Sequence, residues 1–412
     1  MRCRLHVVAA TITTLVLVND AKATDLYTVN VSVTAPTQSG GTSGFNNISD
    51  AISQLQSQNL SSLASTYSDT SAASAVMNLR GVTAVATFPL NSTVLNFTVP
   101  GAGININFAG ATRNQSENML KDWLLQNQGG LTTQLLQYMA GHSPVDPVAG
   151  NPNSLQNTMA RDDFVIGTGI GLTAPGLPSG GLKGQPNLFT LGGEVGYVNS
   201  GGYSSEVITL PIRYTIPFSD ERYAVTIDMP LTYVNTQGAS TGYGSFGTSL
   251  RIPVLENWYL TPAVRAGAVA SLDVGAAAVE YAGSLASRYD IFFDDLQLTI
   301  GNAISLVKVG GVSAAKVTVN YDMFNQLYTN GLQLEGSLPF TLFGSPTSWQ
   351  AYVADTFVGG NQVYVEHYDE FGFTIGSRQS PNTQVWDSLR LGTGFAVGAH
   401  YSSYKLALTY RF

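Results

Sequence analysis

The stretch ITLPIRYTIPF, residues 208–218, alternates apolar and polar side chains at every position. The stretch YAVTIDMPLTY, residues 223–233, repeats the same alternation. A period of two residues is typical of a β-strand that presents one apolar face. Both stretches exceed the ~5–6 residues of an ordinary globular strand and meet the ~9–11 residues that cross a bilayer. They therefore predict long strands suited to a membrane wall.

The same alternation continues through residues 163–412. Further strands are expected to start near Phe189, Phe246, Leu260, Val279, Leu296, Leu332, Val363 and Leu389. Two less regular stretches, 163–172 and 315–323, are doubtful strands. Because single-chain bacterial barrels have an even number of strands, residues 163–412 are predicted to form a transmembrane antiparallel β-barrel of about twelve strands, with fourteen as the alternative.

The composition agrees with a wall that faces something other than water. Charged residues make up 11% of the chain, against ~25% in a typical soluble domain. No run of ~20 apolar residues follows the N-terminus, which argues against a helical membrane protein. A closed barrel is the other structure that satisfies every backbone polar group in hydrocarbon. A soluble β-sandwich also alternates, but the length and number of the strands favour the barrel.

The N-terminus predicts an export signal over residues 1–23. Arg2 and Arg4 precede an apolar core, and Ala21-Lys22-Ala23 matches a small-x-small cleavage site. The single cysteine, Cys3, lies inside this segment, so no disulfide is expected in the exported chain. The net charge of −8 argues against a nucleic-acid partner. The expected location is the bacterial outer membrane.

Two further regions are expected between the signal and the barrel. Residues 24–115 mix short alternating stretches with one helical stretch, which predicts a small α+β domain that is exported or periplasmic. Residues 116–162 are expected to be a helical linker. Its helices are predicted over 116–140, with a break at Gln128-Gly129-Gly130, before a Pro- and Asn-rich stretch at 141–160.

The last residues of the chain carry a second signature. Tyr404, Leu406, Leu408, Tyr410 and Phe412 share one face of a predicted strand. This pattern resembles the terminal strand by which outer-membrane barrel proteins are recognised for assembly. The resemblance implies two partners, the barrel assembly machinery and outer-membrane lipid.

The layout of residues 116–412 also resembles the autotransporter family, with a helical linker followed by a C-terminal barrel. That resemblance implies a twelve-stranded barrel with the helix at 116–140 threading its pore. Residues 24–115 are shorter than the long β-helix that such proteins usually display. Three interpretations of residues 24–115 therefore remain: a displayed domain, a periplasmic domain or a small plug.

Charged side chains occupy the alternate, polar positions of the predicted strands, where they would face the lumen. They are Arg213, Arg251, Arg265, Arg390, Glu194, Asp228 and Glu335. Two interpretations are open. The charges filter ions and small polar solutes, or they form salt bridges that brace the lumen and hold an inserted helix.

No enzymatic activity, cofactor or metal site is expected. His142, His367 and His400 lie at scattered positions, and no metal-ligand spacing occurs. The predicted function is autotransporter-like translocation or transport of the N-terminal segment or of small solutes. The alternative is a barrel-anchored surface-binding protein, an adhesin or a structural outer-membrane protein, with a surface ligand that the sequence does not identify.

Overall fold

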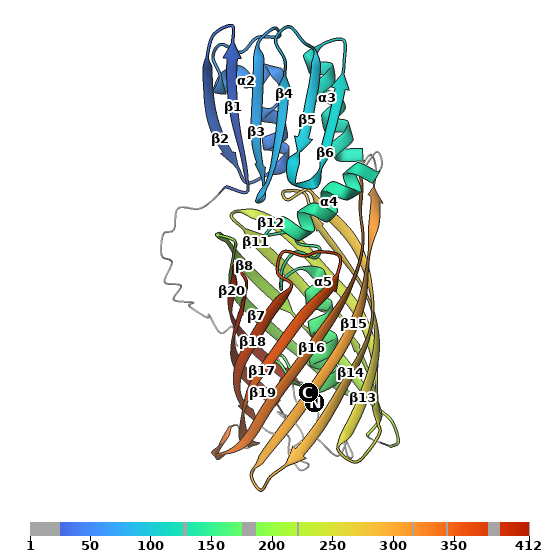
Figure 1. Ribbon diagram of the computed structural model, residues 1–412. Helices are drawn as coiled ribbons and strands as arrows, with labels where there is room; N and C mark the ends of the chain where they lie inside the picture. The colour runs from blue at the N-terminus through green and yellow to red at the C-terminus, as the bar shows by residue number, and fades with distance from the viewer. Residues whose placement is uncertain are drawn as a thin grey trace, which may run out of the picture.

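A computed structural model describes residues 25–126, 130–174, 187–220, 222–314, 317–342, 345–377 and 388–411. An α+β domain rests on one mouth of a β-barrel, and a helix runs down inside the barrel (Figure 1). The expected signal peptide at 1–23 and the terminal Phe412 lie outside the described residues.

The N-terminal domain is a six-stranded antiparallel sheet in the order β2-β1-β3-β4-β5-β6. Its strands are β1 (Tyr27–Ala35), β2 (Ser39–Phe45), β3 (Ala72–Leu79), β4 (Val82–Phe88), β5 (Val94–Val99) and β6 (Ile104–Ala109), with helices α1 (Ile48–Gln54) and α2 (Ser57–Leu63) and the 3-10 turn η1 (Pro100–Ala102). Alternate residues of β1, such as Val29 and Val31, are buried. This confirms the alternation seen in the sequence, since one face of the sheet covers a core.

The helices predicted over 116–140 are α3 (Arg113–Gln126) and α4 (Gly130–His142). Helix α3 packs on the N-terminal sheet, and α4 lies at the mouth of the barrel between the N-terminal domain and β16 (Figure 1). Trp123 of α3 packs between Phe97 and Phe108, with ring centroids 5.8 and 6.2 Å away. Leu135 of α4 joins the same core. The prediction that this segment threads the pore is wrong, because Leu120, Trp123, Leu135 and Met139 are buried in the core of the N-terminal domain.

The helix inside the barrel is α5 (Leu155–Thr168). It occupies residues predicted as the end of the linker and as a doubtful strand at 163–172. The run Phe164-Val165-Ile166 is too short to distinguish a strand from a helix by periodicity. Gly169 ends the helix at a φ of 73°, a left-handed cap that glycine adopts without strain.

The barrel contains fourteen strand segments. They are β7 (Leu188–Ser200), β8 (Tyr203–Leu210), β9 (Ile212–Pro217), β10 (Ala224–Asp228), β11 (Leu231–Thr236), β12 (Ala239–Pro253), β13 (Trp258–Ser271), β14 (Ala276–Phe292), β15 (Leu296–Ala314), β16 (Val317–Leu342), β17 (Ser345–Gly360), β18 (His367–Ser377), β19 (Ser388–Gly398) and β20 (Tyr401–Arg411). Every pairing between neighbouring strands is antiparallel, and β20 pairs with β7 from Tyr401–Ser200 to Arg411–Thr190. That last pairing closes the sheet.

Two of the strands are each divided by a proline. Pro211 separates β8 from β9, and Pro230 separates β10 from β11, because proline has no backbone N–H to donate to the ladder. The proline carbonyls still accept hydrogen bonds, from Gly192 N at 3.0 Å and Ser245 N at 3.2 Å. Each pair of segments is therefore one strand, and the fourteen segments make the predicted closed barrel of twelve strands.

One expected strand is absent from its position. Residues 361–366 around Val363 connect β17 to β18, and their backbone turns onto the linker, where Tyr364 N donates to Ala140 O and Val365 N to Gly150 O. The doubtful strand at 315–323 is real from Val317 onward, as the start of β16. No helix among the described residues combines the length and the hydropathy of a bilayer span.

The outer face of the barrel is apolar. Large exposed apolar and aromatic side chains alternate with inward polar ones on most strands, as the sequence predicted. Examples are Leu191, Val195, Ile208, Leu210, Tyr233, Phe246, Val264, Tyr281, Leu306, Leu332, Phe357, Phe371, Leu391, Tyr404, Leu406 and Leu408. The predicted outward face of the last strand is thus seen at Tyr404, Leu406 and Leu408.

The N-terminal domain contacts the mouth formed by turns 200–203, 236–239 and 271–276, called here the domain mouth. Tyr27 donates its hydroxyl to Val274 O at 2.9 Å, and Ile48 N donates to Asp273 O at 2.9 Å. Asn78 donates to the Tyr203 hydroxyl at 3.2 Å. The opposite mouth holds Leu188, where β7 begins, and Arg411, where β20 ends, and is called the terminal mouth.

Candidate functional site: a helix held in the lumen by ion pairs

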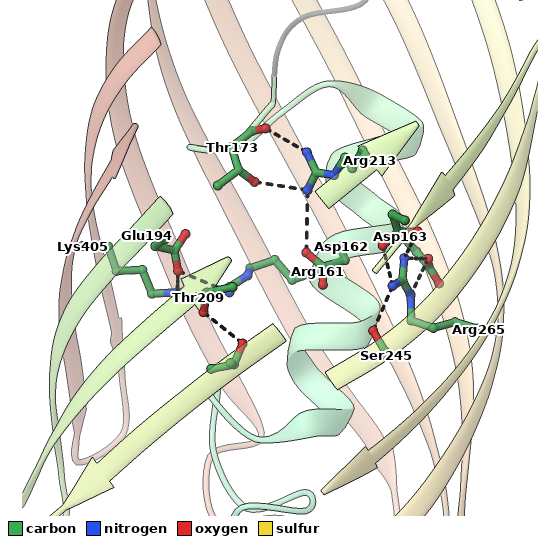
Figure 2. Close-up of polar contacts among 12 residues, drawn as sticks. Arg161, Asp162, Asp163, Thr173, Glu194, Thr209, Arg213, Ser245, Arg265 and Lys405 are labelled. Atoms are coloured by element: carbon green, nitrogen blue, oxygen red, sulfur yellow. Dashed lines mark hydrogen bonds and ion pairs between the residues drawn. The ribbon is translucent and has the colours of Figure 1, made fainter. Parts of the chain in front are cut away.

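Three consecutive charged residues, Arg161, Asp162 and Asp163, lie on α5 inside the barrel. Successive residues of an α-helix point ~100° apart, so these side chains reach three different parts of the wall. Figure 2 shows each of them directed toward a charged side chain of a different strand. The helix and the wall therefore carry matching charges.

Asp163 makes the tightest of these contacts. Its Oδ1 lies 2.8 Å from Arg265 Nη2 on β13, and Ser284 donates to its Oδ2 at 2.6 Å. Arg265 Nη1 also lies 2.7 Å from Asp228 Oδ2 on β10. The three charged side chains are at most 3% exposed. The Arg265 guanidinium thus forms ion pairs with two buried carboxylates, one from the helix and one from the wall.

Asp162 faces Arg213 of β9, with Oδ1 3.8 Å from Nη2. The same guanidinium donates to Thr173 O at 2.8 Å and to Thr173 Oγ1 at 3.2 Å (Figure 2). Thr173 lies beyond the end of α5 on the path toward β7. Arg213 therefore holds both the helix and the chain that leaves it.

Arg161 faces the seam where the barrel closes. Its Nη2 lies 3.6 Å from Glu194 Oε1 on β7, and Lys405 Nζ on β20 lies 3.2 Å from the same oxygen. Glu194 is therefore shared between the helix and the last strand. Since β7 and β20 form the closing pair, this cluster ties α5 to the seam.

The apolar side of α5 packs against β14, β15 and β16. Glycines in the helix and in the wall allow this close approach. A Cβ at Gly167 would overlap the Cβ of Ala286, and one at Gly331 would lie 2.8 Å from Phe164 Cζ. Ion pairs therefore hold one side of the helix, and close packing against the wall holds the other side.

Among the described residues, two small cavities lie along β7. One, beside α5, is lined by Thr190, Arg213 and Arg411, toward the terminal mouth. The other, beside the segment that precedes α5, is lined by Asn153, Val198 and Ser205, toward the domain mouth. Glu194 lies between Thr190 and Val198 on β7, so the Arg161–Glu194–Lys405 cluster separates the two cavities.

Six of the seven residues expected in the lumen are buried, and four of these six meet around α5: Arg213, Arg265, Glu194 and Asp228. The other three of the seven contact the wall. Arg390 donates to Thr374 and Ser348, and Gln350 donates to Glu335 at 2.9 Å. Arg251 stacks 3.8 Å over the Tyr259 ring. The interpretation that luminal charges hold an inserted helix therefore fits the first four.

The sequence analysis missed the helical half of this site. Arg161 and Asp162 fall in the predicted linker and Asp163 at the start of a doubtful strand, and Lys405 is not among the residues predicted to face the lumen. A signal was present, because three adjacent charges are unusual in a chain with 11% charged residues. Such a triplet just before the barrel matches the charges predicted on its inner wall.

The geometry places a helix in the lumen and pairs its charges with those of the wall. Every ionisable group of the helix triplet is paired with a group of the wall, and apolar side chains fill the other side. An arrangement of this kind fixes the position of a helix. Removal of α5 from the lumen would break these buried ion pairs. It would leave buried charges without a partner, which is strongly destabilising.

No family model matches the sequence, and no curated protein does. Several solved structures are similar to it. The β domain of the Bordetella autotransporter BrkA is 15% identical, with a TM-score of 0.43 over 55% of this chain and 98% of that chain. The translocator domain of the autotransporter NalP from Neisseria meningitidis is 15% identical, with a TM-score of 0.41 over 62% and 97% of the two chains.

The COG4313 outer membrane channel from Pseudomonas putida F1 is 12% identical, with a TM-score of 0.37 over 57% and 97% of the two chains. At these identities and scores, the role of the chain has to be argued from its own residues. In its own architecture the chain combines a closed antiparallel β-barrel of twelve strands with a small N-terminal α+β domain.

Proposed function

We propose that the barrel anchors this chain in the outer membrane and displays residues 25–142 at the cell surface, with α5 as the tether that seals the pore. One observation carries the proposal. The helix crosses the closed lumen and connects a domain at one mouth to the first strand, which begins at the other mouth.

The topology supports display over retention in the periplasm. An even number of strands leaves the beginning of β7 and the end of β20 at the same mouth, where Thr190 pairs with Arg411. A barrel that is inserted from the periplasm keeps its chain ends on that side. The N-terminal domain at the opposite mouth would then face outward.

The sealed lumen argues against a permanently open solute pore. Most residues of α5 are buried, including Leu155, Met159 and Phe164. The two cavities along β7 are separated by the Arg161–Glu194–Lys405 cluster. Passage of small solutes would therefore require α5 to leave, whereas display needs it to stay.

Single cysteines test the orientation, because the chain has no cysteine after Cys3. Thr42 is exposed on β2 of the N-terminal domain, and Asp295 is exposed in the turn between β14 and β15 at the terminal mouth. Display predicts that a membrane-impermeant maleimide labels T42C on intact cells. The matched variant D295C should react only after the outer membrane has been permeabilised.

The reverse pattern, with D295C labelled on intact cells and T42C protected, would overturn the proposal and put the domain in the periplasm. A fractionation control is needed first. Both variants should be recovered in the outer membrane and should migrate differently on gels before and after heating, as folded barrels do. Recovery of native protein in the soluble periplasm would also contradict the proposal.

A further inference from the structure

A row of polar side chains crosses the outer face of the barrel near the domain mouth. The register of four neighbouring strands aligns Asn302, Asn330, Asp355 and Asp369, on β15 to β18. Their neighbours on the same face are apolar, including Phe357 on β17 and Phe371 on β18. Such a row is unexpected on a surface that otherwise faces lipid.

Asp355 and Asp369 are direct cross-strand partners in this row. Like charges directly opposite one another destabilise a sheet, and a carboxylate beside hydrocarbon is costly unless it is neutralised. Among the described residues, neither carboxylate forms an ion pair with a lysine or arginine. The side chain in reach is His367, whose Nε2 contacts Asp355 Oδ2. The pair therefore lacks the countercharge that its position requires.

The three side chains converge. His367 begins β18, and its partner across the strand pair is Phe357, one row nearer the domain mouth than Asp355. One nitrogen of His367 and one oxygen each of Asp355 and Asp369 all lie within 4.8 Å of one another. That spacing allows one ion to contact all three atoms, since metal–ligand bonds of ~2.0–2.2 Å hold zinc ligands a few ångströms apart.

We propose that Asp355, His367 and Asp369 form a binding site for a zinc-class divalent cation on the outer wall of the barrel. The cation supplies the charge that the two carboxylates need. An imidazole nitrogen beside carboxylate oxygens suits Zn²⁺ and similar late first-row ions better than Mg²⁺, which prefers oxygen ligands alone. Three protein ligands leave a fourth position open toward the exposed side, where water or a lipid phosphate oxygen completes the tetrahedron.

No motif in the sequence predicts this site. Asp355 lies before the connection at 361–366, and His367 and Asp369 lie after it, so the spacing fits no common zinc pattern. The convergence depends on the register between β17 and β18. A shift of one residue would turn one of the carboxylates into the lumen.

Calorimetric titration of the full, tag-free chain in detergent with ZnCl₂ tests the proposal. One Zn²⁺ is expected to bind per chain, and equimolar Mg²⁺ should not compete. Asp369→Asn keeps the shape of the side chain and removes a charged ligand. It should weaken zinc binding by about tenfold or more, as should His367→Gln, a range typical of losses at metal sites.

Two variants provide matched controls. Asp322→Asn removes an exposed carboxylate that is paired with Lys308, 2.6 Å away, and His400→Asn removes a histidine in the turn before β20, at a φ of 54° that asparagine tolerates. Both should bind zinc like the wild type. The inference is wrong if the wild-type chain binds no zinc, or if Asp369→Asn and His367→Gln bind it unchanged. In that case His367 and Asp355 form an ordinary ion pair.

Discussion

Arg265 is the residue on which the luminal site depends most directly. Its guanidinium contacts Asp163 of the helix and Asp228 of the wall, and its side chain is fully buried. A buried ion pair adds little stability compared with an apolar pair, but removal of one partner leaves an uncompensated buried charge. Here the removal would leave two carboxylates close together.

Arg265→Ala is therefore expected to lower the free energy of unfolding by about 3–5 kcal/mol. Urea unfolding of the detergent-refolded chain, followed by circular dichroism, measures this change. Arg222→Ala is the matched control, because Arg222 pairs with Asp220 at 2.8 Å in an exposed turn. It should leave the unfolding curve unchanged. Equal behaviour of the two variants would contradict the role given to Arg265.

The buried phenol of Tyr27, at the contact between domain and barrel, predicts that the stability of the protein depends on pH. Burial is the main cause that raises the pKa of Tyr27 to about 12, from 10.0, although nearby Arg80 lowers it. The phenol is neutral in both states below pH 10. Between pH 10 and 12 the unfolded chain loses its proton first, so this contribution to stability is present below pH 10 and is lost as the pH rises to 12.

Wild-type stability should therefore fall between pH 10 and 12 more steeply than that of Tyr27→Phe, by about 1.4 kcal/mol per pH unit. Urea midpoints measured from pH 9 to 12 give both slopes. Below pH 9 the variant loses only the hydrogen bond to Val274 O. Parallel slopes in the two proteins would show that Tyr27 is not the titrating group.

At the scale of elements, α5 depends on small residues where it meets β14. Gly167→Ala places a methyl group against Ala286 Cβ, and overpacking of this kind typically destabilises by about 1–3 kcal/mol. Ala286→Gly should restore most of the loss in the double variant. Gly130→Ala at the start of α4, where a Cβ meets no atom within 4 Å, should be harmless. Unfolding midpoints of the four proteins test the pairing.

The elements also show what the sequence could predict. The long strands were visible because each carries one apolar and one polar face, a pattern that depends on the strand itself. The division of two strands was not predicted, although Pro211 and Pro230 stand in the sequence, because both lie on the inward phase and leave the alternation intact.

The luminal helix could not be assigned from helical periodicity. Helix α5 is surrounded by wall, so it shows no simple apolar stripe, whereas α3 and α4 carry stripes because they cover one face of a sheet. The inward charges were predicted from strand phase, at Arg213, Arg265, Glu194 and Asp228. Their partners on α5 were not, since the pairing depends on which segment enters the barrel.

At the scale of the whole molecule, the closed lumen predicts electrical behaviour. The full chain should give no steady current in a planar bilayer, because α5 fills the pore. Removal of residues 25–168 takes away the N-terminal domain and α5 together, and the remaining barrel should conduct steadily. Circular dichroism has to confirm that the shortened chain is still folded. Equal currents from both proteins would show that α5 does not seal the pore.

The seam between β7 and β20 sets an order of events in biogenesis. It joins the first strand of the barrel to the last, so the wall stays open until the final residues have been made. A long sequence separation between partners also makes this pairing slow. Glu194, which binds both Arg161 and Lys405, lies where the two edges meet. Closure of the wall and attachment of its tether thus depend on the same carboxylate.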